Sequence, residues 1–116
     1  MWCLLAEAAF GLVGQVTILP VALAAHPVDD PALAHFRNLF VDPAMWGTSL
    51  ARDLHAAAVE AARERGFKAM RLFSAAGQVR ARRFYEREGW VLAGEEFHDP
   101  VPDLVIVEYR YTLRGG

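Results

Sequence analysis

The 116-residue chain has nearly balanced charges and only one cysteine. Twelve Lys and Arg residues against fourteen Asp and Glu residues give a formal net charge of −2. Nucleic-acid-binding proteins usually show a clear basic excess, so no nucleic-acid partner is expected. The single cysteine, Cys3, excludes an internal disulfide and is expected to be a buried, unreactive thiol. No Cys/His spacing indicates a metal site, and no metal is expected.

The sequence also lacks a long apolar run. Its most apolar stretch, residues 12–25, is interrupted by polar residues and by Pro20, and is too short to span a membrane. The first residues lack the basic start and continuous apolar run of a signal peptide. With 54% hydrophobic and 22% charged residues, the chain has the composition of a globular protein. We expect one domain over residues 1–116, a cytoplasmic location and no membrane contact.

Hydrophobic patterning predicts the order strand, strand, strand, helix, strand, helix, strand, strand. The expected strands cover residues 2–9, 12–23, 34–41, 67–74, 90–95 and 104–113, the last two joined by a loop (FHDPVPD). The expected helices run from residue 50 to a stop at Gly66 and over residues 78–88. This order favours an α/β (α+β) fold, with helices packed on the faces of a mixed sheet.

Two local patterns complete this prediction. On the third strand, strict alternation places His35, Arg37, Leu39 and Val41 on one face and Phe36, Asn38 and Phe40 on the other. On the first helix, one apolar stripe is formed by Leu50, Leu54, Ala57, Ala58 and Ala61.

The segment VDPAMWGTSLA, residues 41–51, joins the third strand to the first helix. A helix start leaves several backbone N–H groups without intrahelical partners, and small side chains allow an anion to approach them. Gly47, Thr48, Ser49 and Ala51 meet that requirement. The alternative is that Ser49 or Thr48 is merely an N-cap.

Placed between a strand and a long helix, the segment resembles the acetyl-CoA-binding motif of the GNAT superfamily of N-acetyltransferases. The family pattern, Arg or Gln, two residues, Gly, one residue, then Gly or Ala, falls on residues 46–51. Trp46 stands in place of the Arg or Gln, and Ser49 in place of the first motif Gly. Arg52 is a candidate substitute for the missing cation.

A second motif makes the resemblance more specific. QVRARRFYEREGW, residues 78–90, resembles the family's Asn-x-x-Ala-x-x-x-Tyr-x-x-x-Gly-Phe. Ala81, Tyr85 and Gly89 are in register, while Gln78 stands for Asn and Trp90 for Phe. The resemblance covers residues 2–113 and implies a mostly antiparallel twisted sheet. The family usually begins with a further strand and two helices, so the resemblance implies an exposed sheet edge and a possible homodimer.

The resemblance implies an N-acetyltransferase that moves an acetyl group from acetyl-CoA, its cosubstrate, to a primary amine by direct attack in a ternary complex. No metal is implied. The acceptor is left open among small amines, peptide N-termini and protein lysines. The rival interpretation is a catalytically degenerate GNAT fold that binds acetyl-CoA or a protein partner without turnover.

For the cofactor, the resemblance implies that strand backbone pairs with the pantetheine arm and that turn amides hold the pyrophosphate. Gln78 would contact the pantetheine or only start its helix. Arg83 or Arg80 would contact the 3′-phosphate, or belong with the neighbouring arginines to a solvated face. The cofactor-binding candidates are Leu39, Phe40, Val41, Trp46, Gly47, Thr48, Ser49, Leu50, Ala51, Arg52, Gln78 and Arg83.

For catalysis, the resemblance implies two proton transfers. Tyr85 is the candidate acid that protonates the departing thiolate; the alternative is that it only packs in the core. His35 is the candidate base, with an unperturbed pKa near 6.5 suited to neutral pH. The alternatives are a solvent-wetted histidine at a strand end and a water molecule as base.

Overall fold

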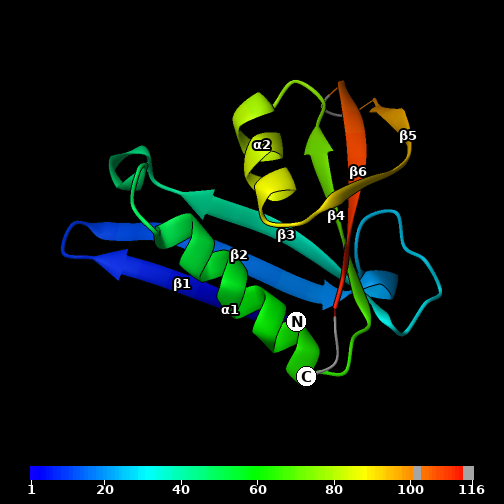
Figure 1. The fold of residues 1–116 in the computed structure, drawn as a ribbon, viewed down its shortest axis with the longest axis horizontal. Coiled ribbons are helices and arrows are strands. Elements are labelled where there is room, and N and C mark those ends of the chain that lie inside the picture. Colours follow the sequence, from blue (N-terminus) through cyan, green and yellow to red (C-terminus); the bar gives the residue numbers. More distant parts are fainter. Residues whose placement is uncertain (101–102, 114–116) are drawn as a thin grey trace.

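A computed structural model of the chain describes residues 1–100 and 103–113 (Figure 1). Its six strands form one sheet in the order β1-β2-β3-β4-β6-β5. β3 and β4 are parallel and the other neighbours are antiparallel, which confirms the predicted mixed, mostly antiparallel fold. The strands are β1 (Trp2–Ala8), β2 (Gly11–Pro20), β3 (Leu33–Val41), β4 (Ala69–Ala75), β5 (Val91–Asp99) and β6 (Leu104–Thr112). The helices are α1 (Leu50–Glu64) and α2 (Val79–Arg87), with short 3₁₀ turns at Val21–Leu23 and Pro43–Met45.

The element order is as predicted, but several boundaries differ. The second strand ends at Pro20 because the chain turns into the 3₁₀ segment Val21–Leu23. β4 begins at Ala69, two positions after the predicted start at Phe67. β5 continues to Asp99, into the expected loop, because Asp99 still pairs with Leu104. Residues 101–102 of that loop lie outside the described part of the chain.

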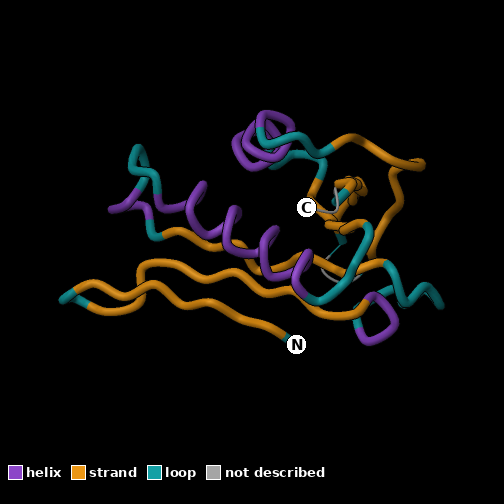
Figure 2. The backbone as a smooth tube through the Cα atoms, turned by 60° about the horizontal axis from the view of Figure 1, so that its bottom comes forward, coloured by secondary structure: helices purple, strands orange, loops and turns teal. Residues whose placement is uncertain are grey.

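Both helices lie on the same face of the sheet (Figures 1 and 2). Phe36 of β3 contacts both of them, since its ring meets His55 of α1 and Tyr85 of α2. On α1 the predicted stripe is confirmed at Leu54, Ala58 and Ala61. The buried residues of α1 also include His55, Val59 and Ala62, which the stripe omitted. Cys3, expected to be buried, is exposed on the edge strand β1.

A β-bulge in β3 overturns the predicted alternation of its side chains. Gln15 pairs with Phe40 and Thr17 pairs with Arg37, so the two residues Asn38 and Leu39 oppose the single residue Val16. Asn38 has a φ of 58°, in the left-handed region. Beyond this point Leu39 and Val41 pack against the core that contains Phe36, and not on the face of His35 and Arg37. An extra residue reverses the facing of every residue that follows it.

Gly14 of β2 lets the start of α1 approach the sheet. A Cβ at Gly14 would lie 2.9 Å from Leu54 Cδ1, 3.1 Å from the Phe40 carbonyl oxygen and 3.3 Å from Leu50 Cδ2. Gly14 is also paired with Val41, directly before the segment that leads to α1. The first turn of α1 is therefore held against the sheet at a residue without a side chain.

We expect Gly14→Ala to lower the free energy of unfolding by about 1–3 kcal/mol, because the added methyl group overpacks the contact between α1 and β2. Urea unfolding followed by circular dichroism measures this loss. Gly77→Ala is the matched control, since nothing lies within 4 Å of a Cβ at Gly77. Equal stability of the two variants would show that α1 shifts without cost.

His55 joins α1 to the segment that follows α2. Trp90 Nε1 donates a hydrogen bond to His55 Nε2 at 2.8 Å, so the neutral ring carries its proton on Nδ1. Nδ1 lies 3.7 Å from Glu88 Oε1. Burial lowers the pKa of His55 below its ordinary value, and Glu88 only partly opposes this effect.

This burial predicts that the fold loses stability on acidification. The unfolded chain protonates His55 near pH 6.5, whereas the folded chain resists protonation until a lower pH, so the unfolded state binds more protons in between. The free energy of unfolding should fall from pH 7 to pH 5. The decrease should be smaller in His55→Gln, which keeps an acceptor for Trp90 but does not titrate. The same slope in both proteins, measured by urea unfolding at each pH, would contradict the prediction.

Candidate functional site

The parallel strands β3 and β4 separate where the expected cofactor arm would lie. Their registered pairs end at His35 with Arg71, although β3 continues to Val41 and β4 to Ala75. Figure 1 shows the two strands diverging beyond this point. Within the described residues, the backbone beyond these pairs forms no further ladder between the two strands. Leu39, Phe40 and Val41 lie on this separated end of β3.

The turn between β3 and α1 is held by its own hydrogen bonds. Asp42 Oδ1 accepts from the Ala44 amide at 2.9 Å, and the Thr48 hydroxyl donates to the Met45 carbonyl at 2.6 Å. Gly47 has a φ of +85°, which a residue with a side chain adopts only with strain. The Thr48 hydroxyl also accepts from the Leu50 amide at 3.3 Å. The N-cap residue of α1 is Ser49, whose side chain makes no capping hydrogen bond, so the expected cap is not formed; Thr48, one residue before it, holds only the Leu50 amide.

The remaining amides at the start of α1 are available to a ligand. In the described part of the chain, the amides of Gly47, Ser49, Ala51 and Arg52 have no hydrogen-bond partner. The Ser49 hydroxyl donates to Asp53 Oδ2 at 2.9 Å and makes no side-chain cap to the helix. Unpartnered amides and the helix dipole together favour an anion here, while the Asp53 carboxylate opposes one.

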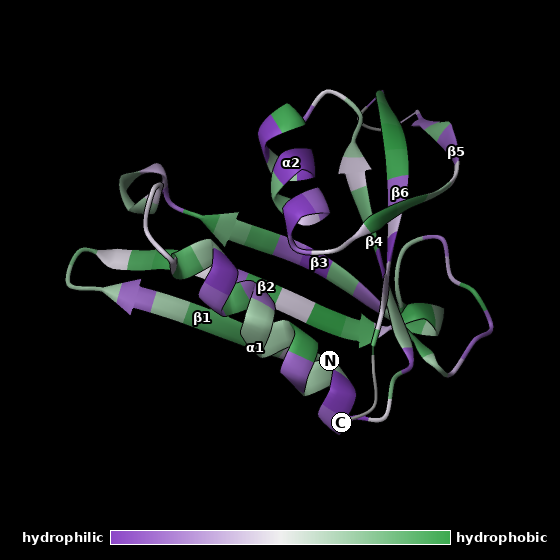
Figure 3. Cartoon of the chain, viewed as in Figure 1, coloured by the Kyte–Doolittle hydropathy of each residue, from purple (hydrophilic) through white to green (hydrophobic). Residues whose placement is uncertain are grey.

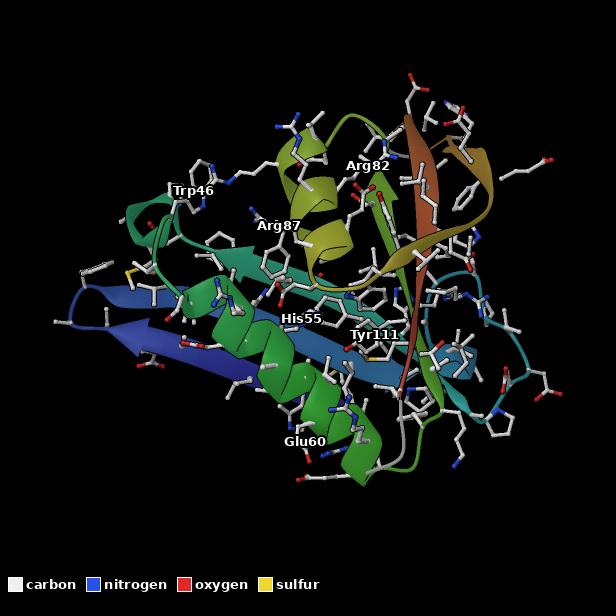
Figure 4. All side chains as sticks on the ribbon, in the orientation of Figure 1. Trp46, His55, Glu60, Arg82, Arg87 and Tyr111 are labelled. Atoms are coloured by element: carbon white, nitrogen blue, oxygen red, sulfur yellow. The ribbon has the colours of Figure 1, made fainter. Side chains whose placement is uncertain are left out.

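Trp46 lies next to this turn and reaches towards α2 (Figure 4). Its indole Nε1 donates to the Val41 carbonyl at 3.2 Å, one of the backbone groups expected to pair with the pantetheine. The guanidinium carbon of Arg80 lies 4.1 Å from the centre of a Trp46 ring. This contact between the turn and α2 was not predicted, because no local pattern links residues so far apart in sequence.

Tyr85 of α2 lies beside the separated strands. Its ring contacts Phe36, the first β3 residue beyond the paired part, and also Trp90 and Tyr109. Burial raises the pKa of Tyr85 to about 12, so its hydroxyl stays protonated at neutral pH. Tyr85 therefore packs against the core and also remains a proton donor.

The other two cofactor-binding candidates associated with α2 are Gln78 and Arg83, and both are exposed. Gln78 is the exposed N-cap residue of α2, and its side chain makes no capping hydrogen bond. Arg83 is exposed on the same helix, as Arg52 is on α1.

His35 differs from both sequence-based descriptions. It is buried, with only 5% of its surface exposed, so the solvent-wetted histidine is wrong. Burial first, and then the nearby Arg71, lower the pKa of His35 to about 4, in place of the unperturbed value near 6.5. Arg71 Nε donates to His35 Nδ1 at 3.1 Å, which places the proton of the neutral ring on Nε2. In this arrangement neither ring nitrogen offers a free lone pair to an amine.

Arg71 is a buried arginine next to His35 that the sequence analysis did not single out. Besides His35, its guanidinium donates to the carbonyls of His26 and Ala25, at 2.7 and 2.8 Å. It thereby fixes the loop after Val21–Leu23 against the sheet face opposite the helices. A cavity of about 420 Å³ opens there, lined by His26, Pro27, Val28, Arg71, Phe73, Phe97 and Glu108. The available signal was a single arginine between the apolar residues Met70 and Leu72 of a predicted strand.

Two kinds of feature are absent from the described residues. No group of three or more His, Cys, Asp or Glu side chains is arranged there to hold a metal ion. No helix among them is long and apolar enough to cross a membrane.

The fold is similar to that of known acetyltransferases. A protein from Desulfovibrio desulfuricans assigned to the GNAT family superposes with a TM-score of 0.78 at 18% identity, over 97% of this chain and 69% of its own length. A protein from Bacillus anthracis assigned as a streptothricin acetyltransferase, solved with acetyl coenzyme A, has a TM-score of 0.78 at 19% identity. That match covers 97% of this chain and 62% of the other, so this chain spans less than two thirds of it.

A third structure, ribosomal-protein-alanine N-acetyltransferase from Brucella melitensis, has a TM-score of 0.76 at 20% identity, over 96% of this chain and 68% of its own. A search of curated proteins found no matching sequence. The family model described as "Acetyltransferase (GNAT) family" matches residues 3–90, about three quarters of the sequence. By this match, in agreement with the fold, the chain belongs to the GNAT acetyltransferase family.

Proposed function

We propose that the chain is an acetyl-CoA-dependent N-acetyltransferase that acts on a primary amine by direct attack in a ternary complex. The observation that carries this proposal is the set of unpartnered amides at Gly47, Ser49, Ala51 and Arg52, next to the separated ends of β3 and β4. The amides would hold the pyrophosphate of the cofactor. The backbone of residues 39–41 would then lie along its pantetheine arm. Gln78 and Arg83 remain proposed cofactor contacts.

The proposed reaction transfers one acetyl group and needs no further reactant. The neutral amine nitrogen forms a bond to the thioester carbonyl carbon, the carbon–sulfur bond breaks, and the thiolate of CoA leaves. Tyr85 gives its proton to that thiolate, and the proton lost by the amine returns to solvent or restores the phenol. With a pKa of about 12 the phenol of Tyr85 is fully protonated at neutral pH and can donate, although the raised pKa also makes it a weaker acid than a solvent-exposed Tyr.

The base is less well supported. With Arg71 donating to Nδ1, His35 takes a proton from the amine only if that hydrogen bond breaks. A water molecule is therefore the favoured base. A pH–rate profile that changes in His35→Gln would restore His35 to the role.

The acceptor is proposed only as a primary amine. The B. anthracis and B. melitensis proteins are described with different acceptors, streptothricin and a ribosomal-protein alanine, so likeness of fold does not select one. A homodimer through β1, an outer strand of the sheet, also stays a prediction, as does the cytoplasmic location. A monomer by light scattering would contradict the dimer.

The first test of the function is a titration of the purified chain with acetyl-CoA, using desulfo-CoA as a second ligand. We expect binding of both, because the phosphates and pantetheine are shared, followed by release of CoA when amines are added. Binding without turnover across small amines, peptides and lysine-containing proteins would favour the degenerate alternative. A folded chain that binds neither ligand would contradict the proposal.

We expect Tyr85→Phe to lower kcat about 100-fold or more with little change in the Kd for acetyl-CoA, because only the proton donor is lost. The measurement is the initial rate of thiol release at saturating cosubstrates. Tyr111→Phe is the matched control, since it removes a hydroxyl from another Tyr that contacts Trp90 in the same aromatic cluster. Turnover of Tyr85→Phe within twofold of the control would leave Tyr85 with a packing role alone.

A further inference from the structure

The turn before α1 has little positive charge of its own. Its family motif position for Arg or Gln is occupied by Trp46. Two carboxylates lie close to the turn: Asp42, bonded to the Ala44 amide, and Asp53, bonded to the Ser49 hydroxyl. Arg52 is the one cation that residues 42–53 carry. A phosphate approaching the free amides therefore meets acidic side chains and lacks the usual guanidinium.

A second guanidinium reaches this turn from α2. Arg80 is the second residue of α2, and its guanidinium carbon lies 4.1 Å from the centre of a Trp46 ring, a cation–π contact. The ring itself is oriented by the hydrogen bond from Nε1 to the Val41 carbonyl. Trp46 thus occupies the motif position of a cation, and its ring also holds the Arg80 guanidinium next to the same turn.

Hydrogen bonds hold α2 in place and leave Arg80 exposed. Arg82 is already engaged, since it donates to the Tyr109 hydroxyl at 3.0 Å and to the Ala76 carbonyl at 2.8 Å. Tyr109 in turn donates to Glu86 at 2.6 Å, so that two residues of α2 are tied to one hydroxyl of β6. Most residues of α2 are hydrophilic (Figure 3). Arg80, close to the start of this anchored helix, remains exposed and is directed to the turn.

We propose that Arg80, positioned by Trp46, binds a phosphate group of the nucleotide part of acetyl-CoA and replaces the guanidinium that the motif lacks. Trp46 is then a positioning residue, and Arg80 takes the place first given to Arg52. This inference rests on the proposed function. The group that Arg80 would bind is a phosphate, which belongs either to the diphosphate or to the 3′-phosphate of the cofactor.

The test measures Kd by calorimetry for acetyl-CoA, CoA and dephospho-CoA, each at low and high salt. We expect Arg80→Ala to raise the Kd for acetyl-CoA about tenfold at low salt, and to weaken the salt dependence of binding, because one charged hydrogen bond is lost. Arg87→Ala is the matched control, an exposed arginine at the other end of α2. Circular dichroism verifies that each variant is folded.

Trp46 is tested together with Arg80. Trp46→Ala should weaken binding nearly as much as Arg80→Ala. Trp46→Phe should weaken it less, because it keeps a ring for Arg80 but loses the Nε1 hydrogen bond that orients the ring. The double variant Trp46→Ala/Arg80→Ala should bind no more weakly than Arg80→Ala alone. This pattern separates positioning of Arg80 from an independent effect on the turn. Additive losses would contradict the positioning role of Trp46.

Dephospho-CoA distinguishes the two phosphates. If the effect of Arg80→Ala disappears with this ligand, the partner is the 3′-phosphate; if it persists, the partner is the diphosphate. The inference is overturned if Arg80→Ala binds like Arg87→Ala, or if Arg52→Ala alone removes the salt dependence. Failure of the unmodified chain to bind acetyl-CoA would instead overturn the proposed function, and this inference with it.

Discussion

The arrangement of the candidate site depends on the hydrogen bonds made by the buried guanidinium of Arg71. Arg71 belongs to the last registered pair of the parallel strands β3 and β4, and it donates across that pair to His35. It also holds the carbonyls of Ala25 and His26, from the connection that leads into β3. One side chain therefore fixes two strands and a loop at the position where the strands begin to separate.

This cation is buried among neutral acceptors, which makes the geometry demanding. Desolvation lowers the pKa of Arg71, and the nearby Glu108 carboxylate raises it. A buried charge is tolerated only where hydrogen bonds replace its water, and the three acceptors supply those bonds. The same demand accounts for the arrangement of His35, whose Nδ1 is needed as an acceptor; its low pKa comes first from burial and then from the nearby Arg71. A histidine that serves a structural cation in this way is poorly placed to be a base.

Sequence periodicity predicted the strands and helices because those patterns are local. The apolar stripe of α1 and the two motifs at residues 46–51 and 78–90 have fixed spacings, so they identified the helix faces and the family. The bulge at Asn38 has no such signature, and it reversed the facing of Leu39 and Val41. The burial of His35 and the contact of Trp46 with Arg80 depend on residues distant in sequence, which a single sequence cannot bring together.

The departures from the motif affect side chains more than the backbone that the cofactor needs. Gly47 has a left-handed conformation, and within the described residues the amides of Ser49, Ala51 and Arg52 have no hydrogen-bond partner, although Ser49 replaces a motif Gly. Trp46 takes the motif position of a charged residue, and a charged side chain from another element held near the turn can replace that residue. α2 is such an element, because Arg82, Tyr109 and Glu86 tie it to β6. The same helix carries Tyr85 against Phe36, so the hydrogen bonds that anchor α2 bear on both the proposed phosphate contact and the proposed proton donor.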